Sequence, residues 1–594
     1  MNALKHLNKY FYKYRIRLLL GIVFVITQNF FALYPAQLVR KAIDMVIALK
    51  NAGRATDSST IVSITHAILI ILLVIVGVAI ARGILMFMMR QTIIVVSRRI
   101  EFDLKNEIFH QYQRLSLSFY RRNNTGDLMN RISEDVSRVR MYLGPAVMYT
   151  INLAFLFILI IVSMLNVNVK LTLYVLAPLP LLSLSIYWVS DIMNRKGEEV
   201  QEQQSKLSTF VQEAFSGIRV IKSFVKEEQS VTDFAVESEH YKNQSLSLAK
   251  VNAMFFPLML LLVGLSTLLT VYFGGKEVIA GRITTGNIAE FIIYVNMLTW
   301  PVASLGWVTS IVQRAAASQE RINEFLRLEP EIVSTEEKPV DMRGKIEFHD
   351  VSFVYADSGI KALDHVSFKI EEGKSLAVLG KTGSGKSTLA NLLLRMFDPT
   401  SGKILIDNRD ISQISLAFLR QQIGYVPQDV FLFSDTIEHN IEFGLTNGVT
   451  PVERKRLAVE AAKQAVIYEN IMEFSKNFET MIGERGITLS GGQKQRISIA
   501  RAIIRKPKIL LFDDCLSAVD TKTEEHILNN LKEVMKNKTS IIISHRVSSV
   551  KHADQIIVLD AGKVVEQGNH DSLLTEKGMY FELYEKQLLE EEVG

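Results

Sequence analysis

This sequence of 594 residues has very little cysteine and only a small net charge. Cys515 is the single cysteine, which excludes a disulfide bond within the chain. The formal net charge of +5 is small for this length and gives no indication of nucleic-acid binding. A cleavable signal peptide is not evident either, because the first apolar segment lacks a small-residue cleavage site and runs on into Pro35. We therefore expect the first apolar segment to be retained.

Apolar residues are abundant but unevenly distributed along the chain. Hydrophobic residues make up 48% of the sequence and the mean hydropathy is +0.18, which is high beside 22% charged residues. Apolar runs alternate with charged loops up to about Val312, whereas the sequence beyond Gly344 is typical of a soluble α/β domain. The chain is also longer than one hydrophobic core usually organises. We predict an all-α transmembrane domain over 1–325, a linker over 326–344 and an α/β domain over 345–594.

Six apolar segments are long enough to span a membrane. A helix of about 20 residues crosses the hydrocarbon layer, and only helices satisfy their own backbone polar groups there. Basic residues before the first segment favour a cytoplasmic N-terminus, and six crossings return the chain to the cytoplasm. The predicted spans are 18–39, 62–86, 143–165, 169–190, 254–275 and 288–309.

Two long charged gaps separate the second span from the third and the fourth from the fifth. Both gaps are poor in proline and keep apolar residues at helical spacing, as at Leu128, Ile132 and Val136 in the first gap. This periodicity favours membrane helices that extend into the cytoplasm and return, over a pair of disordered loops.

Several polar residues lie inside the predicted spans. They either line a substrate path or form hydrogen bonds between helices, because buried polar groups in a membrane need partners. Glu290 and His66 lie near span ends, where they can equally reach water. The six candidates are Gln28, Asn29, His66, Asn152, Glu290 and Asn296.

A phosphate-binding loop begins the chemistry of the second domain. The apolar run 375–380 predicts a buried strand, and it leads through the glycine-rich sequence GKTGSGKST into an apolar helical run. Backbone N–H groups and the helix dipole at such a junction favour the phosphates of a nucleotide. Lys386 would contact the β- and γ-phosphates and Ser387 would bind Mg²⁺. The nucleotide-binding candidates are Gly380, Thr382, Gly383, Ser384, Gly385, Lys386, Ser387 and Thr388.

Two adjacent carboxylates follow a second apolar run. Residues 509–514 read ILLFDD, which is typical of a buried parallel strand ending in acidic residues. Asp513 would hold Mg²⁺, and Asp514 would orient or deprotonate the attacking water. Alone, the pair could be a turn or a helix cap, but behind a phosphate loop it indicates a Walker B element.

In this order, the motifs resemble those of ABC transporters, specifically half-transporter exporters with six helices followed by one nucleotide-binding domain. The resemblance covers nearly the whole chain. It implies that Tyr355 stacks on adenine, that Gln428 senses the γ-phosphate and Mg²⁺, and that His545 is the switch histidine. Leu489–Gln493 matches the family signature and Ser517–Asp520 matches the D-loop.

Three further segments resemble those of exporters rather than importers. Leu115–Val136 and Ser216–Phe224 are similar to the two cytoplasmic loops with coupling helices, and Ile482–Gly486 is similar to the loop that couples the two domains. Importers usually carry their two domains on separate chains, so the resemblance disfavours import. No peptidase domain is expected before the first span.

The resemblance also implies an obligate dimer. In this family Ser490, Gly491, Gly492 and Gln493 would contact ATP held by the opposite subunit, so one chain cannot complete a site. Two ATP molecules would close the nucleotide-binding domains together, and the membrane helices would alternate between inward-facing and outward-facing states.

Asp514 departs from the family pattern, which has glutamate after the Walker B aspartate. The aspartate side chain is shorter by about 1.5 Å, and catalytic positioning is sensitive at that scale. We therefore expect slow hydrolysis at this site. Aspartate here resembles one member of heterodimeric exporters, but Gln428 and His545 are in place, so a homodimer and a heterodimer with a related half-transporter both stay open.

The resulting hypothesis is an ATP hydrolase that exports or flips amphipathic drugs, lipids or peptides. Its catalytic residues would be Asp514, His545 and Gln428, its metal ligands Ser387, Gln428 and Asp513, and its cofactors ATP and Mg²⁺. It would be a multi-pass protein of the bacterial inner or plasma membrane, in contact with lipid and a small amphipathic substrate. The alternative is a non-pumping relative, either an ATP-gated channel or a regulatory subunit.

Overall fold

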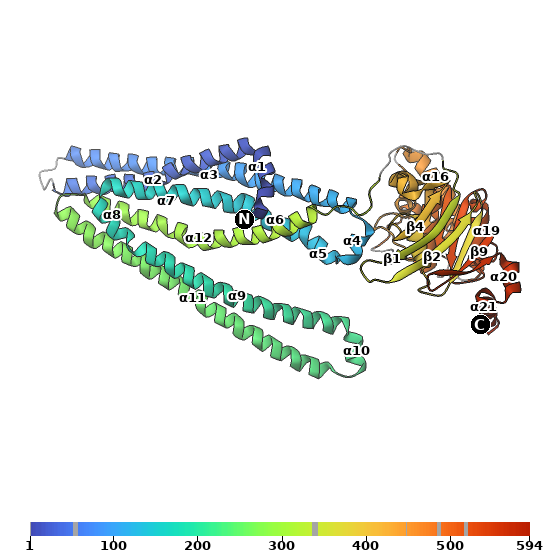
Figure 1. Cartoon of the computed structure of the whole chain (residues 1–594). Coiled ribbons are helices and arrows are strands. Elements are labelled where there is room, and N and C mark those ends of the chain that lie inside the picture. The colour runs from blue at the N-terminus through green and yellow to red at the C-terminus, as the bar shows by residue number, and fades with distance from the viewer. Residues whose placement is uncertain are drawn as a thin grey trace. The chain divides into compact units, whose positions relative to one another are not determined.

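The computed structural model forms two compact units, each described by itself (Figure 1). The first contains residues 1–113 and 126–328, and the second contains residues 114–125 and 329–594. The structure describes residues 2–51, 58–334, 342–446, 448–483, 489–515 and 521–593.

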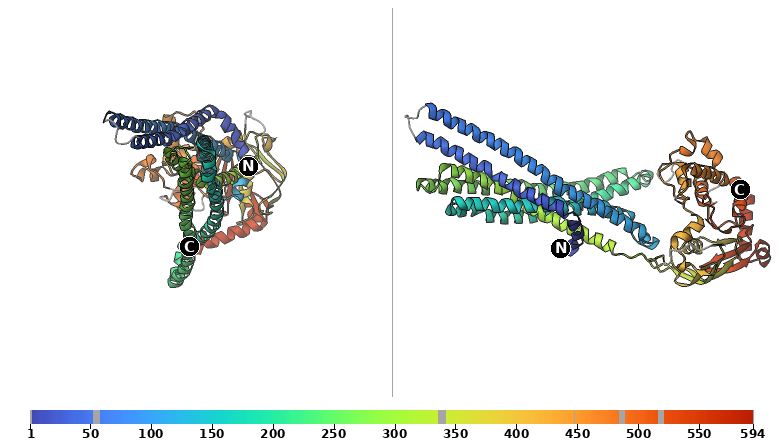
Figure 2. Two further views of the ribbon diagram at one scale, coloured as in Figure 1. Left: turned by 90° about the vertical axis from the view of Figure 1, so that its left-hand side faces the viewer. Right: turned by 90° about the horizontal axis from the view of Figure 1, so that it is seen from above.

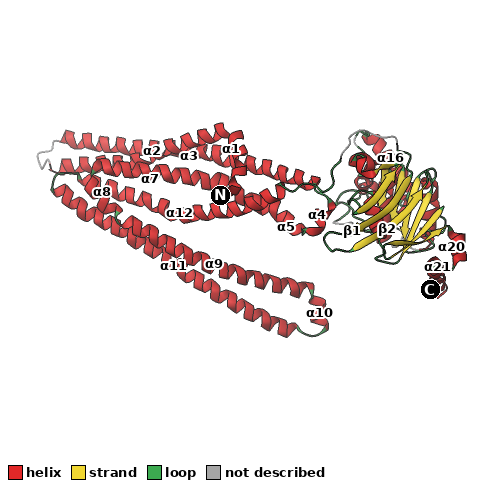
Figure 3. Ribbon diagram, in the orientation of Figure 1, coloured by secondary structure: helices red, strands yellow, loops and turns green. Residues whose placement is uncertain are grey.

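The described residues of the first unit form helices joined by short loops, with no strand among them (Figure 3). Its elements are η1 (Asn2–Leu7), α1 (Asn8–Lys13), α2 (Arg15–Asn51), α3 (Ser58–Arg114), α5 (Thr125–Asn130), η3 (Arg131–Asp135), α6 (Val136–Met141), η4 (Tyr142–Ala146), α7 (Val147–Val167), α8 (Val169–Leu176), α9 (Pro178–Ser216), α10 (Ile218–Ser223), α11 (Glu227–Ile279) and α12 (Thr285–Leu326).

Within the described part of the chain, five helical runs are long and apolar enough to cross a membrane. They are α2, α3, the run from α5 to α7, α11 and α12, which agrees with five of the six predicted spans. The predicted span 169–190 is not one helix, because it divides at Ala177 between α8 and α9. Pro178 and Pro180 have no backbone N–H, so two bonds of a continuous helix cannot form there.

The two charged gaps are ordered helices, as the periodicity predicts. In the second gap, α9 and α11 run side by side and α10 joins them at the far end (Figures 1 and 2). In the first gap, α3 continues to Arg114 and the short helices α4 (Leu117–Arg122), α5 and α6 follow.

Most of the polar residues in the spans bind neighbouring helices. Asn152 Oδ1 of α7 accepts hydrogen bonds from Gln28 Nε2 and Asn29 Nδ2 of α2, at 2.8 Å and 3.1 Å. Glu290 does not reach water: it is 1% exposed and its Oε2 lies 3.1 Å from Arg40 Nη1 of α2. His66 is exposed on α3. These contacts support the role of Gln28, Asn29 and Asn152 in helix association.

Asn296 uses its side chain within its own helix. Its Nδ2 donates to the carbonyl of Ile292, at 2.8 Å, and the side chain is otherwise exposed on α12. Which residues line a substrate path therefore remains a prediction.

The second unit is an α/β domain built on two sheets, as predicted. A four-stranded antiparallel sheet has the order β2-β1-β4-β5, and a six-stranded sheet has the order β10-β9-β3-β8-β7-β6. Among the described strands of the larger sheet, β10 pairs antiparallel to β9 and the other neighbours pair parallel. The strands are β1 (Ile346–Val354), β2 (Lys361–Ile370), β3 (Ser375–Gly380), β4 (Ser401–Ile406), β5 (Arg409–Asp410), β6 (Ile423–Val426), β7 (Ile509–Asp513), β8 (Thr539–Ser544), β9 (Gln555–Asp560) and β10 (Lys563–Gly568).

The helices of the second unit begin with α4, which precedes all of its strands in the chain. The others are α13 (Lys386–Leu393), η5 (Ile411–Gln413), α14 (Leu416–Gln422), α15 (Ile437–Glu442), α16 (Pro451–Gln464), α17 (Tyr468–Glu473), η6 (Asn477–Glu479), α18 (Gly491–Ile503), α19 (Thr521–Met535), α20 (His570–Glu576) and α21 (Met579–Val593).

The parallel strands β3, β7 and β8 bring three polar segments to one sheet edge. All residues of β7 are buried, as expected for a strand with helices on both faces. Because carboxyl ends of parallel strands meet at the same edge, the residues after Gly380, Phe512 and Ser544 converge there.

Candidate functional site

The loop from β3 to α13 has the backbone geometry of a phosphate cradle. Gly383 and Gly385 adopt left-handed conformations with φ of +84° and +103°. A Cβ at Gly385 would lie 2.3 Å from the carbonyl oxygen of Ala362, so only glycine fits. Ser384 Oγ is buried and has no hydrogen-bond partner among the described residues. The loop thus offers an unsatisfied hydroxyl beside the N-terminus of α13, where an anion is favoured.

Lys386 folds back across this loop. Its Nζ donates hydrogen bonds to the carbonyls of Gly380, at 2.7 Å, and Lys381, at 2.9 Å. Burial lowers the pKa of Lys386, while the carboxylates of Asp513 and Asp514 act in the opposite direction. The ammonium group is therefore held beside the loop and close to both acidic residues.

Ser387 and Asp513 meet at the end of β7. Ser387 Oγ donates to Asp513 Oδ1 at 3.3 Å. Asp513 is 3% exposed, and this burial raises the pKa of its carboxyl group while the Ser387 hydroxyl lowers it. A hydroxyl and a carboxylate at this distance are two ligands of the type that Mg²⁺ prefers.

The three predicted catalytic side chains lie together. Gln428 Nε2 donates to Asp514 Oδ2 at 3.2 Å, and His545 Nδ1 lies 2.9 Å from Asp514 Oδ1. Asp514 itself has φ of +47°, a left-handed conformation that aspartate and asparagine tolerate better than most residues. The carboxylate is therefore fixed from two sides at the edge of the sheet.

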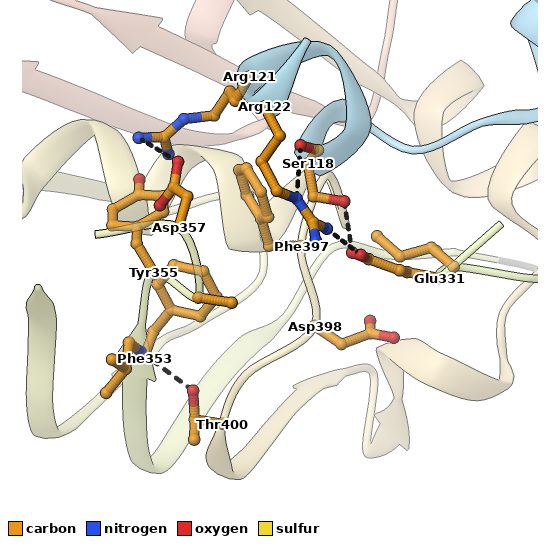
Figure 4. Close-up of a pocket in the computed structure, with 13 residues that line it drawn as sticks. Ser118, Arg121, Arg122, Glu331, Phe353, Tyr355, Asp357, Phe397, Asp398 and Thr400 are labelled. Atoms are coloured by element: carbon orange, nitrogen blue, oxygen red, sulfur yellow. Dashed lines mark hydrogen bonds and ion pairs between the residues drawn. The ribbon is translucent and has the colours of Figure 1, made fainter. Parts of the chain in front are cut away.

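Tyr355 lies beside the phosphate loop in a pocket of about 240 Å³ (Figure 4). Its hydroxyl is 3.0 Å from Thr388 Oγ1 of α13, which links the aromatic ring to the helix of the loop. The Arg121 guanidinium of α4 lies over the ring, 4.1 Å from its centre, and pairs with Asp357 at 3.4 Å. Ser118 and Arg122 of the same segment bind Glu331.

The signature segment has a defined helix start in a different part of the domain. Ser490 caps α18: its Oγ accepts from Gln493 N at 3.2 Å, and its own N–H donates to Gln493 Oε1 at 2.9 Å. Gly491 and Gly492 form the first turn. The helix packs in one core cluster, with Leu489, Ile497 and Ile499, whereas α13 packs in another.

Two predicted segments lie outside the described residues. They are the D-loop, Ser517–Asp520, and the last three residues of Ile482–Gly486. Sequence reasoning missed Arg121, because nothing in a basic pair after Tyr120 indicates which aromatic ring it covers. It also missed the left-handed backbone of Asp514, which depends on the strand end and not on a local motif.

Comparisons with known proteins identify both parts of the chain. The protein-family model for the ABC transporter transmembrane region matches residues 18–302, and the family model for the ABC transporter domain matches residues 363–517. A probable multidrug resistance ABC transporter ATP-binding/permease protein of Bacillus subtilis is 34% identical over 99% of this chain and 98% of its own length. An ATP-dependent lipid A-core flippase of Syntrophus aciditrophicus is 34% identical over 94% of this chain and 90% of its own length.

A solved structure gives the same result for the fold. A bacterial Atm1-family ABC exporter with ATP bound is 26% identical, with a TM-score of 0.78, over 96% of this chain and 98% of that one. Relatives along the full length and a matching fold for both parts leave one conclusion. The chain belongs to the ABC transporter family, with its transmembrane region and its ATP-binding domain fused, and it couples ATP hydrolysis to transport.

Proposed function

We propose that this protein is one half of a dimeric exporter that moves amphipathic drugs, lipids or peptides across the bacterial inner or plasma membrane. The observation that carries the proposal is the fusion of one transmembrane region with one phosphate loop and one signature segment. The names of the relatives support it, since one is a probable multidrug transporter and another a lipid A-core flippase.

The separation of the two ATP-contacting segments supports the proposed dimer. The phosphate loop and the signature helix pack in different core clusters of the domain, so each would meet the complementary segment of a second subunit. ATP binding would then close the two domains. The chain would cross the membrane six times, with α8 and the start of α9 together as the fourth crossing, and the N-terminus and both nucleotide-binding domains would lie in the cytoplasm. Transport would proceed by alternating access.

Mg²⁺ fits the donors at this site. Ser387, Asp513 and Gln428 would hold it, and the bound ion would neutralise charge on the phosphates. The described residues include no group of three or more histidine, cysteine or acidic side chains suited to a metal. The ion would therefore depend on phosphate oxygens for the rest of its ligands, as is usual for Mg²⁺ with nucleotides.

ATP-dependent accumulation of a fluorescent amphipathic dye inside inside-out vesicles tests the proposed direction and the pump itself. We expect accumulation against a gradient, because a pump uses ATP to shift the population of inward- and outward-facing states. Vesicles carrying Lys386→Ala serve as the control. Dye that only equilibrates in the presence of ATP would indicate a channel and would contradict the proposal.

Replacing Arg121 by alanine is expected to tighten ATP binding. Arg121 covers the Tyr355 ring, so adenine would stack there only after displacing it. Such a cation–π contact contributes about 0.5–1 kcal/mol at a half-exposed site, which corresponds to a decrease of about 2- to 5-fold in the Kd for ATP. Titration with a fluorescent ATP analogue measures this change.

Arg122→Ala is the matched control for this experiment. It removes the same charge from the same helix, but Arg122 binds Glu331 and does not cover Tyr355. An equal change in both variants would assign the effect to net charge. Weaker binding in Arg121→Ala alone would mean that Arg121 holds the nucleotide instead of competing with it.

A further inference from the structure

The C-terminal helix reaches the segment that carries His545. Gln587 of α21 makes two hydrogen bonds to this segment. Its Oε1 accepts from the backbone N–H of Val547 (2.7 Å), and its Nε2 donates to the backbone carbonyl of His545 (2.8 Å). One side-chain amide thus binds the backbone on both sides of Arg546. The segment after β8 has no regular secondary structure at His545 and Arg546, and these two bonds help to hold it, together with the bond from the Arg546 N–H to Ser544 Oγ at 3.0 Å.

Helix α21 is itself held firmly where it begins. Tyr580 is fully buried, its backbone N–H donates to Glu566 Oε2 at 3.0 Å, and its hydroxyl lies 2.7 Å from His570 Nδ1. Tyr580 also packs with Val547 and Val550 in one core cluster. The helix that presents Gln587 is therefore fixed on the same core as the segment that it binds.

An amide side chain has the two groups that these bonds need. It supplies one acceptor for the Val547 N–H and one donor for the His545 carbonyl, whereas an ionised carboxylate only accepts and an aliphatic side chain does neither. His545 in turn lies 2.9 Å from Asp514 Oδ1 through its Nδ1. A continuous set of contacts thus joins α21 to the carboxylate at the end of β7.

We propose that Gln587 is a positioning residue for ATP hydrolysis, which fixes the backbone of His545 and through it the contact between His545 and Asp514. The inference rests on the proposed role of His545. Both of these hydrogen bonds go to the backbone around His545, so we expect Gln587 to act on the chemical step and not on nucleotide binding. Loss of the two bonds would let the backbone of His545 shift, and displacements near 1 Å at a reacting centre lower rates by up to about 100-fold.

Gln587→Met tests this proposal in the full-length, detergent-solubilised protein. Methionine keeps the length of the side chain but removes both hydrogen bonds. We expect kcat for ATP to fall about 10-fold, as for a partial displacement, with KM for ATP unchanged within a factor of about 2. Gln587→Glu keeps the acceptor for the Val547 N–H but turns a carboxylate oxygen toward the His545 carbonyl oxygen, so its kcat should fall as well.

Glu585→Ala is the matched control, because Glu585 is exposed on the same helix two residues away. Its kcat should equal that of the wild type. A thermal midpoint measured for each variant separates positioning from unfolding: a variant that is only less stable loses folded protein but keeps its kcat per folded molecule. Unchanged kcat in folded Gln587→Met would overturn the inference.

A double-mutant cycle with His545→Ala separates this inference from the proposed site. If Gln587 acts through His545, adding Gln587→Met to His545→Ala causes no further loss of kcat. If His545→Ala leaves kcat unchanged, the proposed role of His545 fails. If His545→Ala lowers kcat but Gln587→Met lowers it further by the same factor as in the wild type, the positioning role of Gln587 fails while the site itself stands.

Discussion

Replacing Lys386 by alanine is expected to lower ATP hydrolysis by at least about 100-fold, the usual effect of removing one group that stabilises charge in the transition state. The Lys386 ammonium is held at the phosphate loop by the carbonyls of Gly380 and Lys381. Phosphoryl transfer depends on positioning and on stabilisation of charge, for which alanine offers no substitute. Phosphate release by the purified protein, reconstituted in lipid, measures the effect.

A matched lysine shows whether this loss is specific. Lys403 is exposed on β4, and its replacement by alanine removes the same charge from the same domain. We expect its turnover to equal that of the wild type. Residual hydrolysis in Lys386→Ala above about a tenth of the wild-type rate would contradict the assignment of the phosphate loop, since the expected loss is at least ten times greater.

The features predictable from the sequence are those with local causes. The strand, glycine turn and helix around Lys386 are contiguous, and the positive φ of Gly385 explains why glycine stands there. The helical gaps between the spans were also predictable, because a period of 3.6 residues is a property of one segment. In the same way the buried run before Asp513 indicated a parallel strand, and β7 is that strand.

Features that depend on distant residues were not predictable. Arg121 reaches Tyr355, and Gln587 reaches His545, only because of how the chain packs. The break at Ala177 is an intermediate case: the prolines at 178 and 180 are a local signal for it, but a span predicted from apolar length alone does not register them.

The role of Asp514 is tested most directly by asparagine. Asparagine has the same size and tolerates the same left-handed backbone, so the fold of the site is kept, although one acceptor oxygen replaces the two carboxylate oxygens that face Gln428 and His545. It cannot take a proton from water. We expect hydrolysis to fall by about 100-fold, the lower end of the range for a general base. Turnover that is lost in Lys386→Ala but retained in Asp514→Asn would remove Asp514 from the role of base.

Asp514→Glu is expected to raise the rate of ATP hydrolysis, and it also tests whether the protein is a homodimer or a heterodimer. Glutamate extends the side chain by about 1.5 Å. If the native carboxylate lies too far from the attacking water, we expect the rate of hydrolysis to rise by about 10-fold. The reason is that a misplacement near 1 Å lowers a rate by up to about 100-fold. Glutamate is less tolerant of φ near +47°, with a strain of about 1–2 kcal/mol, so the thermal midpoint should fall as activity rises. A fall in turnover would mean that the surrounding residues already fit aspartate.

Activity gained by the chain purified alone would show that one kind of subunit can form a competent site, whereas activity that appears only with a related half-transporter would assign this chain to a heterodimer.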